Sequence, residues 1–175
     1  MSRSWPAALL ALLAIGGLAG CDDSEQFPPA CPSLALLRDA ADLTRYDSVG
    51  RDLSDLVLDG RITAVPARCE RGKPGIVKAT LDVSFDITRG PAAHAQRLDV
   101  PYFVAVTEGD HVLDEQDYRL AVALPPNVDR TQVSSDDIVL NLPVTRKKSA
   151  AAYQVYVGFR LTPDELAINR QRGPR

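Results

Sequence analysis

The side chains best suited to chemistry in this chain of 175 residues are three cysteines and two histidines. Histidine is a common general base near neutral pH. His94 lies in a loop-like segment, and His111 directly follows an acidic turn. No G-x-S-x-G, H-E-x-x-H or glycine-rich phosphate-binding motif accompanies them. We therefore expect exposed turn histidines, no catalytic residues and no cofactor, with a hydrolase as the least favoured alternative.

Two charged clusters could bind ions or surfaces. The acidic cluster lies between positions 108 and 117 and could offer oxygen ligands to calcium, but its spacing differs from that of a calcium loop. Its members are Glu108, Asp110, Asp114, Glu115 and Asp117. We expect a solvated hairpin there and no metal site. The basic run Arg146-Lys147-Lys148 could meet lipid headgroups or an acidic partner, although three cations are also typical of a solvated turn.

The N-terminal segment has the parts of an export signal. Arg3 precedes an apolar stretch over residues 7–18, which is shorter than the roughly 20 residues needed to span a bilayer. The stretch ends in Leu18-Ala19-Gly20-Cys21, which resembles the lipobox of bacterial lipoproteins. The resemblance implies cleavage before Cys21, attachment of a diacylglycerol to its thiol and acylation of the new amino terminus. The alternative is an ordinary signal peptide with a chance cysteine.

The lipobox resemblance implies a location and a redox state. Several acyl chains on Cys21 would hold the protein to the inner or outer membrane, on the periplasmic side of the cell envelope. Asp22 resembles the inner-membrane retention signal of enterobacterial lipoproteins. Cys31 and Cys69 then remain as an even pair in an oxidising compartment. We expect a disulfide that stabilises the fold by about 4 kcal/mol, with a reactive redox pair as the alternative.

The chain divides into three segments. Residues 1–20 read as the signal peptide, and residues 21–33 as the lipidated cysteine with an acidic, proline-rich tether. Residues 34–175 have the length of a single domain. The net charge of −3 offers no excess of cations to neutralise phosphates, which argues against nucleic acid as a partner.

Alternation of apolar and polar residues predicts strands through most of the domain. It is strict over residues 77–88, which we expect to form one strand with a buried and a solvated face. Residues 108–110 read as a hairpin turn. Residues 34–46 fit either a short helix or an irregular edge strand. The other expected strands cover residues 57–69, 100–107, 112–124, 138–144 and 153–161.

One helix is expected, at the C-terminal end of the domain. Thr162 supplies an N-cap hydroxyl, Pro163 suits the first helical position, and Glu165 completes a capping box. Six or seven short strands followed by this helix predict an all-β fold. We expect an antiparallel β-sandwich of immunoglobulin-like architecture, with a small barrel as the alternative.

Three aromatic residues are candidates for an interface. Tyr156 lies on the polar parity of the last strand, with Tyr102 or Phe103 expected nearby. Burial under the C-terminal helix would explain Tyr156 equally well. Residues 99–106 (DVPYFVAV) and 153–163 (YQVYVGFRLTP), with the lipobox and the cysteine pair, resemble uncharacterised lipoproteins of alphaproteobacteria. That resemblance implies a shared fold and anchor, and no activity.

Two functions fit these features. We favour a non-enzymatic interaction or assembly module of the cell envelope, in which sheet edges or loop ends bind a protein partner by strand addition. The alternative is an envelope lipoprotein that binds a small molecule or saccharide in its interior or on its loops.

Overall fold

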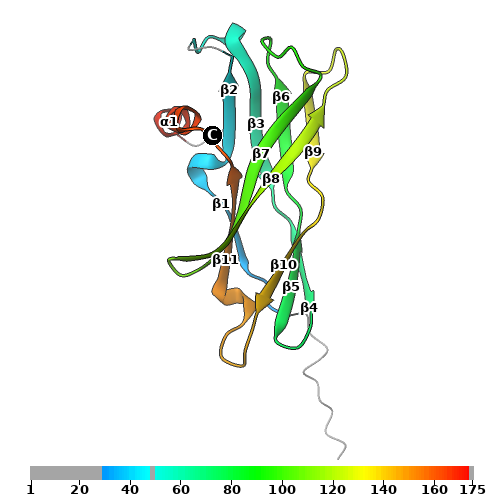
Figure 1. The fold of residues 1–175 in the computed structure, drawn as a ribbon, viewed down its shortest axis with the longest axis vertical. Helices are drawn as coiled ribbons and strands as arrows, with labels where there is room; N and C mark the ends of the chain where they lie inside the picture. Colours follow the sequence, from blue (N-terminus) through cyan, green and yellow to red (C-terminus); the bar gives the residue numbers. More distant parts are fainter. Residues whose placement is uncertain (1–28, 48–49, 174–175) are drawn as a thin grey trace, which may run out of the picture.

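The part of the protein that the structure describes is mostly β, with three sheets and one short C-terminal helix (Figure 1). The computed structural model describes residues 29–47 and 50–173. Within these residues the strands are β1 (Ser33–Leu36), β2 (Asp42–Tyr46), β3 (Leu56–Ala64), β4 (Ala67–Arg71), β5 (Ile76–Leu81), β6 (Ser84–Arg89), β7 (Arg97–Glu108), β8 (His111–Ala123), β9 (Arg130–Ser134), β10 (Ile138–Pro143) and β11 (Tyr153–Phe159). The helix is α1 (Pro163–Arg172), and the short 3-10 turns are η2 (Arg38–Ala40), η3 (Leu53–Asp55) and η4 (Ala150–Ala152).

The strands form two four-stranded sheets and one three-stranded sheet. Their orders are β1-β11-β7-β8, β2-β3-β6-β9 and β10-β5-β4. Pairing is antiparallel except between β1 and β11, which run parallel. The expectation of an entirely antiparallel arrangement was therefore wrong at this pair. The described strands close no barrel, so that alternative is also wrong.

The structure has more strands than the six or seven expected, because several predicted strands are interrupted. Residues 57–69 form β3 and β4, and residues 77–88 form β5 and β6. The segment 34–46 is divided between two sheets, since β1 and β2 flank the turn η2. β9 was not expected, because its five residues (RTQVS) carry only one large apolar side chain.

The three-stranded sheet continues strands of the sheet β2-β3-β6-β9. β3 leads into β4, β5 into β6, and β9 into β10, with two or three residues between each pair (Figure 1). The register also carries across one interruption. Ala64 lies opposite Ser84, and Ala67 lies opposite Leu81. The second pair is three residues later on one strand and three residues earlier on the other. These strands therefore build one long layer with a break across its middle.

At the break, other hydrogen bonds replace the ladder. The amide of Asp82 donates to the carbonyl of Pro66 at 3.3 Å, and the amide of Val83 donates to Oγ of Ser135 at 3.0 Å. Pro66 has no N–H to give to a ladder. The burial pattern nevertheless alternates through the break, and the side chain of Val83 is fully buried. The prediction for residues 77–88 was right about the faces and wrong about a single strand.

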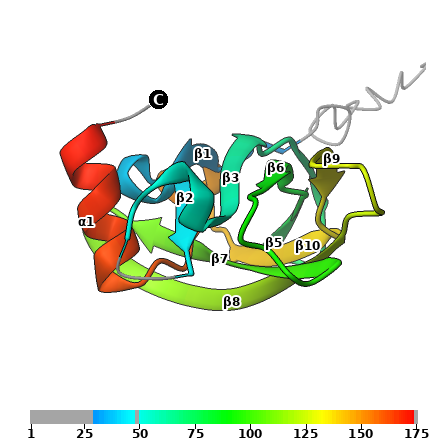
Figure 2. The ribbon, with the colours of Figure 1, turned by 90° about the horizontal axis from the view of Figure 1, so that it is seen from above.

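The core lies between the sheet β1-β11-β7-β8 and the long layer built from the other two sheets. The two four-stranded sheets face each other in Figure 2. Phe85 of β6 contacts Tyr102 of β7, with ring centroids 5.1 Å apart, and Phe159 of β11 at 5.8 Å. Phe85 and Phe159 are almost completely buried. Burial of such aromatic side chains contributes about 1.5–3 kcal/mol each. These contacts join the two sheets into one packed unit.

The helix α1 begins as the sequence predicts. The hydroxyl of Thr162 accepts the amide of Glu165, and the carboxylate of Glu165 accepts the amide of Thr162, which completes the capping box. Glu165 is buried and also pairs with Nε of Arg45 in β2 at 2.8 Å. The cap therefore fixes both the start of the helix and its position against β2.

Candidate functional site

The predicted lipidation site lies outside the described residues. Cys21 and residues 22–28 precede Pro29, the first described position, so the lipobox and most of the tether stay predictions. Within the described residues, no helix is both long and apolar enough to cross a membrane. The structure does describe how the chain enters the domain after this segment.

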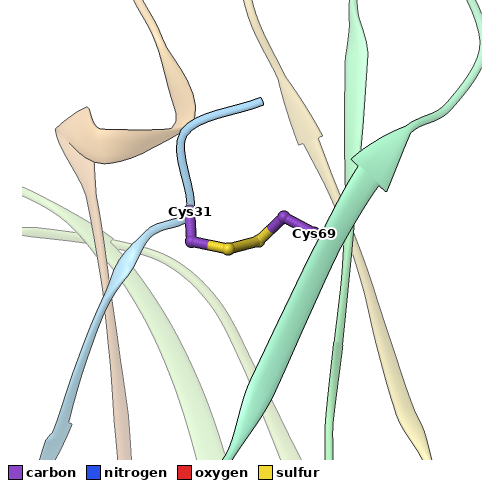
Figure 3. Close-up of a disulfide and its surroundings, with 2 residues drawn as sticks. All are labelled: Cys31 and Cys69. Carbon is purple, nitrogen blue, oxygen red and sulfur yellow. A yellow bond between two sulfur atoms is a disulfide. The ribbon is translucent and has the colours of Figure 1, made fainter. Parts of the chain in front are cut away.

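The chain enters through a disulfide between Cys31 and Cys69, as expected (Figure 3). The bridge joins residues 38 positions apart, with Cα atoms separated by 5.6 Å. Cys31 lies just before β1, which pairs with β11, whereas Cys69 lies in β4 of the three-stranded sheet. The disulfide therefore links two sheets at the end where the chain enters.

The three predicted interface aromatics lie on two different faces. Tyr102 points into the core, is 4% exposed, and stacks on Tyr118 with ring centroids 5.2 Å apart. This burial raises the pKa of Tyr102 above its ordinary value. Phe103 and Tyr156 belong to a smaller apolar cluster outside this core. Successive strand residues point to opposite faces, so including Tyr102 in a surface with Phe103 was wrong.

The face that carries Phe103 is partly covered by the protein itself. Phe103 packs with Ala40 of η2, and the guanidinium of Arg160 lies 4.6 Å from the centre of its ring. Gly158 permits this packing, because a Cβ there would lie 3.0 Å from Ala40 Cβ and from Phe103 Cε1. Tyr156 is half-buried beside this cluster, and its hydroxyl donates to Oε1 of Gln154 at 2.8 Å.

A recess of about 470 Å³ opens between this cluster and α1. Its apolar wall includes Leu37, Phe103 and Leu166, and Arg38 and Arg170 stand at its margin. Leu37 is 42% exposed. The recess combines apolar lining with cations, but Arg170 pairs with Asp39 at 3.0 Å, and the ring of Phe103 is already engaged by Arg160.

Three of the five acidic residues near the β7–β8 turn, Glu108, Glu115 and Asp117, are paired with cations. Nζ of Lys148 lies 2.6 Å from Oε2 of Glu108. Arg160 bridges Glu115, at 2.5 Å, and Asp117. The hydrogen bonds that Arg160 donates to Glu115 and, to a smaller extent, to Asp117 raise the pKa of its guanidinium. The predicted hairpin is confirmed, and four of its five carboxylates, including Asp114, which accepts from Gln116, bind side chains of the protein.

The remaining groups that could do chemistry lie apart from one another. His94 is exposed in the segment before β7, and His111 is exposed at the start of β8. Among the described residues, no group of three or more histidine, cysteine or acidic side chains could hold a metal ion. The described geometry therefore offers surfaces for binding rather than a cluster of reactive groups.

The second of these surfaces is a seam between β8 and β10, which we call the β8–β10 seam. β8 ends the order β1-β11-β7-β8, and β10 ends the order β10-β5-β4, so each has one strand neighbour among the described residues. A cavity of about 510 Å³ lies between them. Val106, Leu113, Val139 and Leu142 form much of its apolar wall. Two sheet edges thus border one apolar groove.

A β-bulge gives the seam its shape at β8. Val106 pairs with Asp114 and Thr107 pairs with Val112, which leaves Leu113 as an extra residue on β8. Such a bulge bends the strand and redirects side chains. Neighbouring residues of a regular strand point to opposite faces, but because of the bulge Leu113 and Asp114 both line the groove.

Three large apolar side chains of these edges are exposed. The exposed fractions are 62% for Val112, 52% for Leu113 and 47% for Val139. Sequence reasoning missed this site, although one signal was present. Val139 lies on the parity opposite to the buried Ile138 and Leu140, so its exposure could have been predicted.

The candidate site is therefore a binding surface made by strands far apart in sequence. The recess between the Phe103 cluster and α1 is another such surface. The β8–β10 seam joins residues 106–116 to residues 139–153. Neither surface contains a recognised catalytic motif in the described residues. Comparisons with protein-family models, with curated proteins and with solved structures find no match.

Proposed function

We propose that this protein is a lipoprotein of the bacterial cell envelope, anchored through Cys21, whose β domain binds a protein partner without catalysing a reaction. The observation that carries the binding role is the β8–β10 seam, where two strand edges border an apolar groove. The domain is best regarded as an immunoglobulin-like β-sandwich, a reading supported by the aromatic contacts between its facing sheets.

The seam suits an extended strand of a partner. An edge strand presents unpaired N–H and C=O groups along one side, and β8 offers thirteen residues of such an edge. An added strand would continue the sheet by main-chain hydrogen bonds, while alternate apolar side chains enter the groove beside Leu113 and Val139. We therefore propose strand addition at β8 as the mode of binding.

The anchor and the oxidising location are supported by different observations. The sequence before Cys21 resembles a lipobox. The Cys31–Cys69 disulfide is of the kind that persists outside the cytoplasm. Together they support a domain displayed on the periplasmic side of the inner or outer membrane.

Saccharide binding, the alternative from the sequence, has less support. An aromatic side chain offers a ligand an apolar face only where its ring is exposed. Tyr102 is buried in the core, and the ring of Phe103 is covered by Arg160. Two of the three predicted aromatic residues therefore present no open ring face, and Tyr156 is half-buried, which favours a protein partner over a saccharide.

Photo-crosslinking in living cells tests the binding role. A photoreactive amino acid is placed at Leu113 or Val139 in the seam, and at Leu53, which is 77% exposed in η3, as the matched control. We expect the same discrete adduct from both seam positions and none from position 53. In a protein labelled at 113, Val139→Lys should remove that adduct. Equal adducts at all three positions, or none at the seam, would contradict the proposal.

A further inference from the structure

The four lysines of the chain gather at one end of the molecule. They are Lys73, Lys78, Lys147 and Lys148. Lys73 lies in the turn between β4 and β5, Lys78 near the start of β5, and the other two in the loop after β10. This is the lower end in Figure 1, where residue 29 begins the described chain. Residues more than 60 positions apart thus place their ammonium groups in one region.

A backbone contact holds the two cationic loops together. The amide of Val144, in the loop after β10, donates to the carbonyl of Gly75 at 2.8 Å. A second hydrogen bond, from the amide of Gly72 to the carbonyl of Ile76 at 3.0 Å, closes the turn between β4 and β5. Gly75 has a φ of 78°, a conformation that glycine adopts readily. The turn before β5 and the loop after β10 therefore keep a defined relative position.

Two of the four lysines are neutralised and two are not. Lys78 pairs with Glu70 at 2.7 Å, and Lys148 pairs with Glu108 at 2.6 Å. Lys73 and Lys147 are exposed, as is Arg146, and these three make no ion pair with another described residue. We call Lys73, Arg146 and Lys147 the cationic end.

The chain enters the domain beside the cationic end. A recess of about 610 Å³ is lined by Pro29 and Ala30 as well as by Lys73 and Thr145. The disulfide at Cys31 fixes this entry against β4. Seven residues, 22–28, separate Cys21 from Pro29, and a chain of that length spans at most about 25 Å. A lipid on Cys21 would therefore keep this end close to the bilayer surface.

We propose that the cationic end docks on the anionic phospholipid headgroups of the membrane that holds the anchor, and so orients the domain on its tether. The proposal rests on the proposed lipid anchor. Lys73, Arg146 and Lys147 supply the charge complementarity, and their loops project from the end nearest the anchor. Basic side chains beside a bilayer are attracted by anionic lipids within a Debye length.

Lysine acetylation in proteoliposomes tests this docking. The full-length lipidated protein is reconstituted in vesicles of phosphatidylcholine alone, or with about a third of phosphatidylglycerol. Mass spectrometry then gives the acetylation rate at each lysine. We expect Lys73 and Lys147 to react about fivefold more slowly on the anionic vesicles, and salt at about 0.5 M to restore their rates.

Matched variants separate charge from proximity. An Arg51→Lys substitution adds a reporter at the opposite end, next to η3, and its rate should be the same on both vesicles. Arg146→Glu should restore reaction at Lys73 on anionic vesicles, whereas Arg119→Glu on the exposed face of β8 should not. The affected side chains are exposed, so neither variant disturbs the core.

Each contrary outcome has a distinct meaning. If the protein floats with the vesicles but its lysines react equally on both, the anchor stands and the docking fails. If Cys21 carries no lipid, the proposed function fails, and this inference with it. A third outcome is that the lysines are protected from acetylation equally on both vesicles and in detergent. If neutralising Asp22, Asp23 and Glu25 then relieves this protection, the tether covers the cations, and the docking is overturned.

Discussion

The buried side chain of Asn169 donates a hydrogen bond of 2.7 Å to the backbone carbonyl of Asp42. The same amide nitrogen donates to the carbonyl of Asp39 at 2.8 Å. One residue of α1 thus satisfies carbonyls on both sides of the link between η2 and β2. This contact makes the C-terminal helix part of the folded domain.

We predict that Asn169→Ala destabilises the protein by about 1–3 kcal/mol, because a buried and a partly buried carbonyl group lose their donor. The free energy of unfolding can be measured by urea denaturation followed by circular dichroism. Gln171→Ala, at an exposed position of the same helix, is the control and should change stability little. An equal loss in both variants would contradict the role of this contact, since alanine is itself the best helix former and costs nothing through helix propensity.

We predict that Cys69→Ser lowers the free energy of unfolding by about 4 kcal/mol, since the unfolded chain gains the freedom that the cross-link removes. The disulfide joins residues 38 positions apart. A reducing agent should lower the stability of the wild-type protein by a similar amount and leave the variant unchanged. A variant that still responds to the reducing agent would contradict this assignment.

Gly158→Ala should destabilise the protein by about 1–3 kcal/mol, because the added methyl group would overpack the cluster around Phe103. The new Cβ would meet Ala40 Cβ at 3.0 Å. Ala40→Gly in the same protein should then recover part of the loss, as a double-mutant cycle would show. Purely additive effects would mean that the two positions are not in contact.

The ion pair between Asp86 and Arg130 should make stability depend on pH in acid. The hydrogen bond from Arg130 lowers the pKa of the Asp86 carboxyl below its ordinary value. The folded protein therefore binds this proton less readily than the unfolded chain. The resulting stabilisation is complete above the unfolded pKa of about 4, and is lost as the pH falls through the lowered folded value.

Arg130→Gln tests this dependence. We expect the variant to be less stable than the wild-type protein at neutral pH, and the difference to shrink as the pH falls below about 4. Denaturation by urea at a series of pH values measures it. Arg119→Gln, on β8, is the control. A difference in stability between Arg130→Gln and the wild-type protein that stays constant across the pH series would rule out Asp86 as the titrating group.

The sequence predicted which residues face the core better than it predicted which strands are neighbours. Alternation over residues 77–88 gives the buried face correctly, because side chains in extended chain alternate whatever the pairing. The break at Asp82 involves Pro66, between β3 and β4, and Ser135, between β9 and β10. No local pattern reports such partners.

The helix start was predictable because all its determinants are local. Thr162 and Glu165 are three residues apart and complete each other's hydrogen bonds. The two surfaces could not be predicted from the sequence, since the β8–β10 seam and the cationic end each combine residues that are far apart along the chain. That Tyr102 and Phe103 lie on different faces could have been predicted, because adjacent strand positions point to opposite faces.

The disulfide also decides how the domain bears mechanical load. Without it, a pull on the chain ahead of Cys31 would act on β1, whose four residues pair with β11. With it, the load passes through a covalent bond into Cys69 and spreads over the sheet β10-β5-β4. β1 is therefore sheltered from tension on the N-terminal segment, and reduction of the bridge would transfer that tension to a few hydrogen bonds.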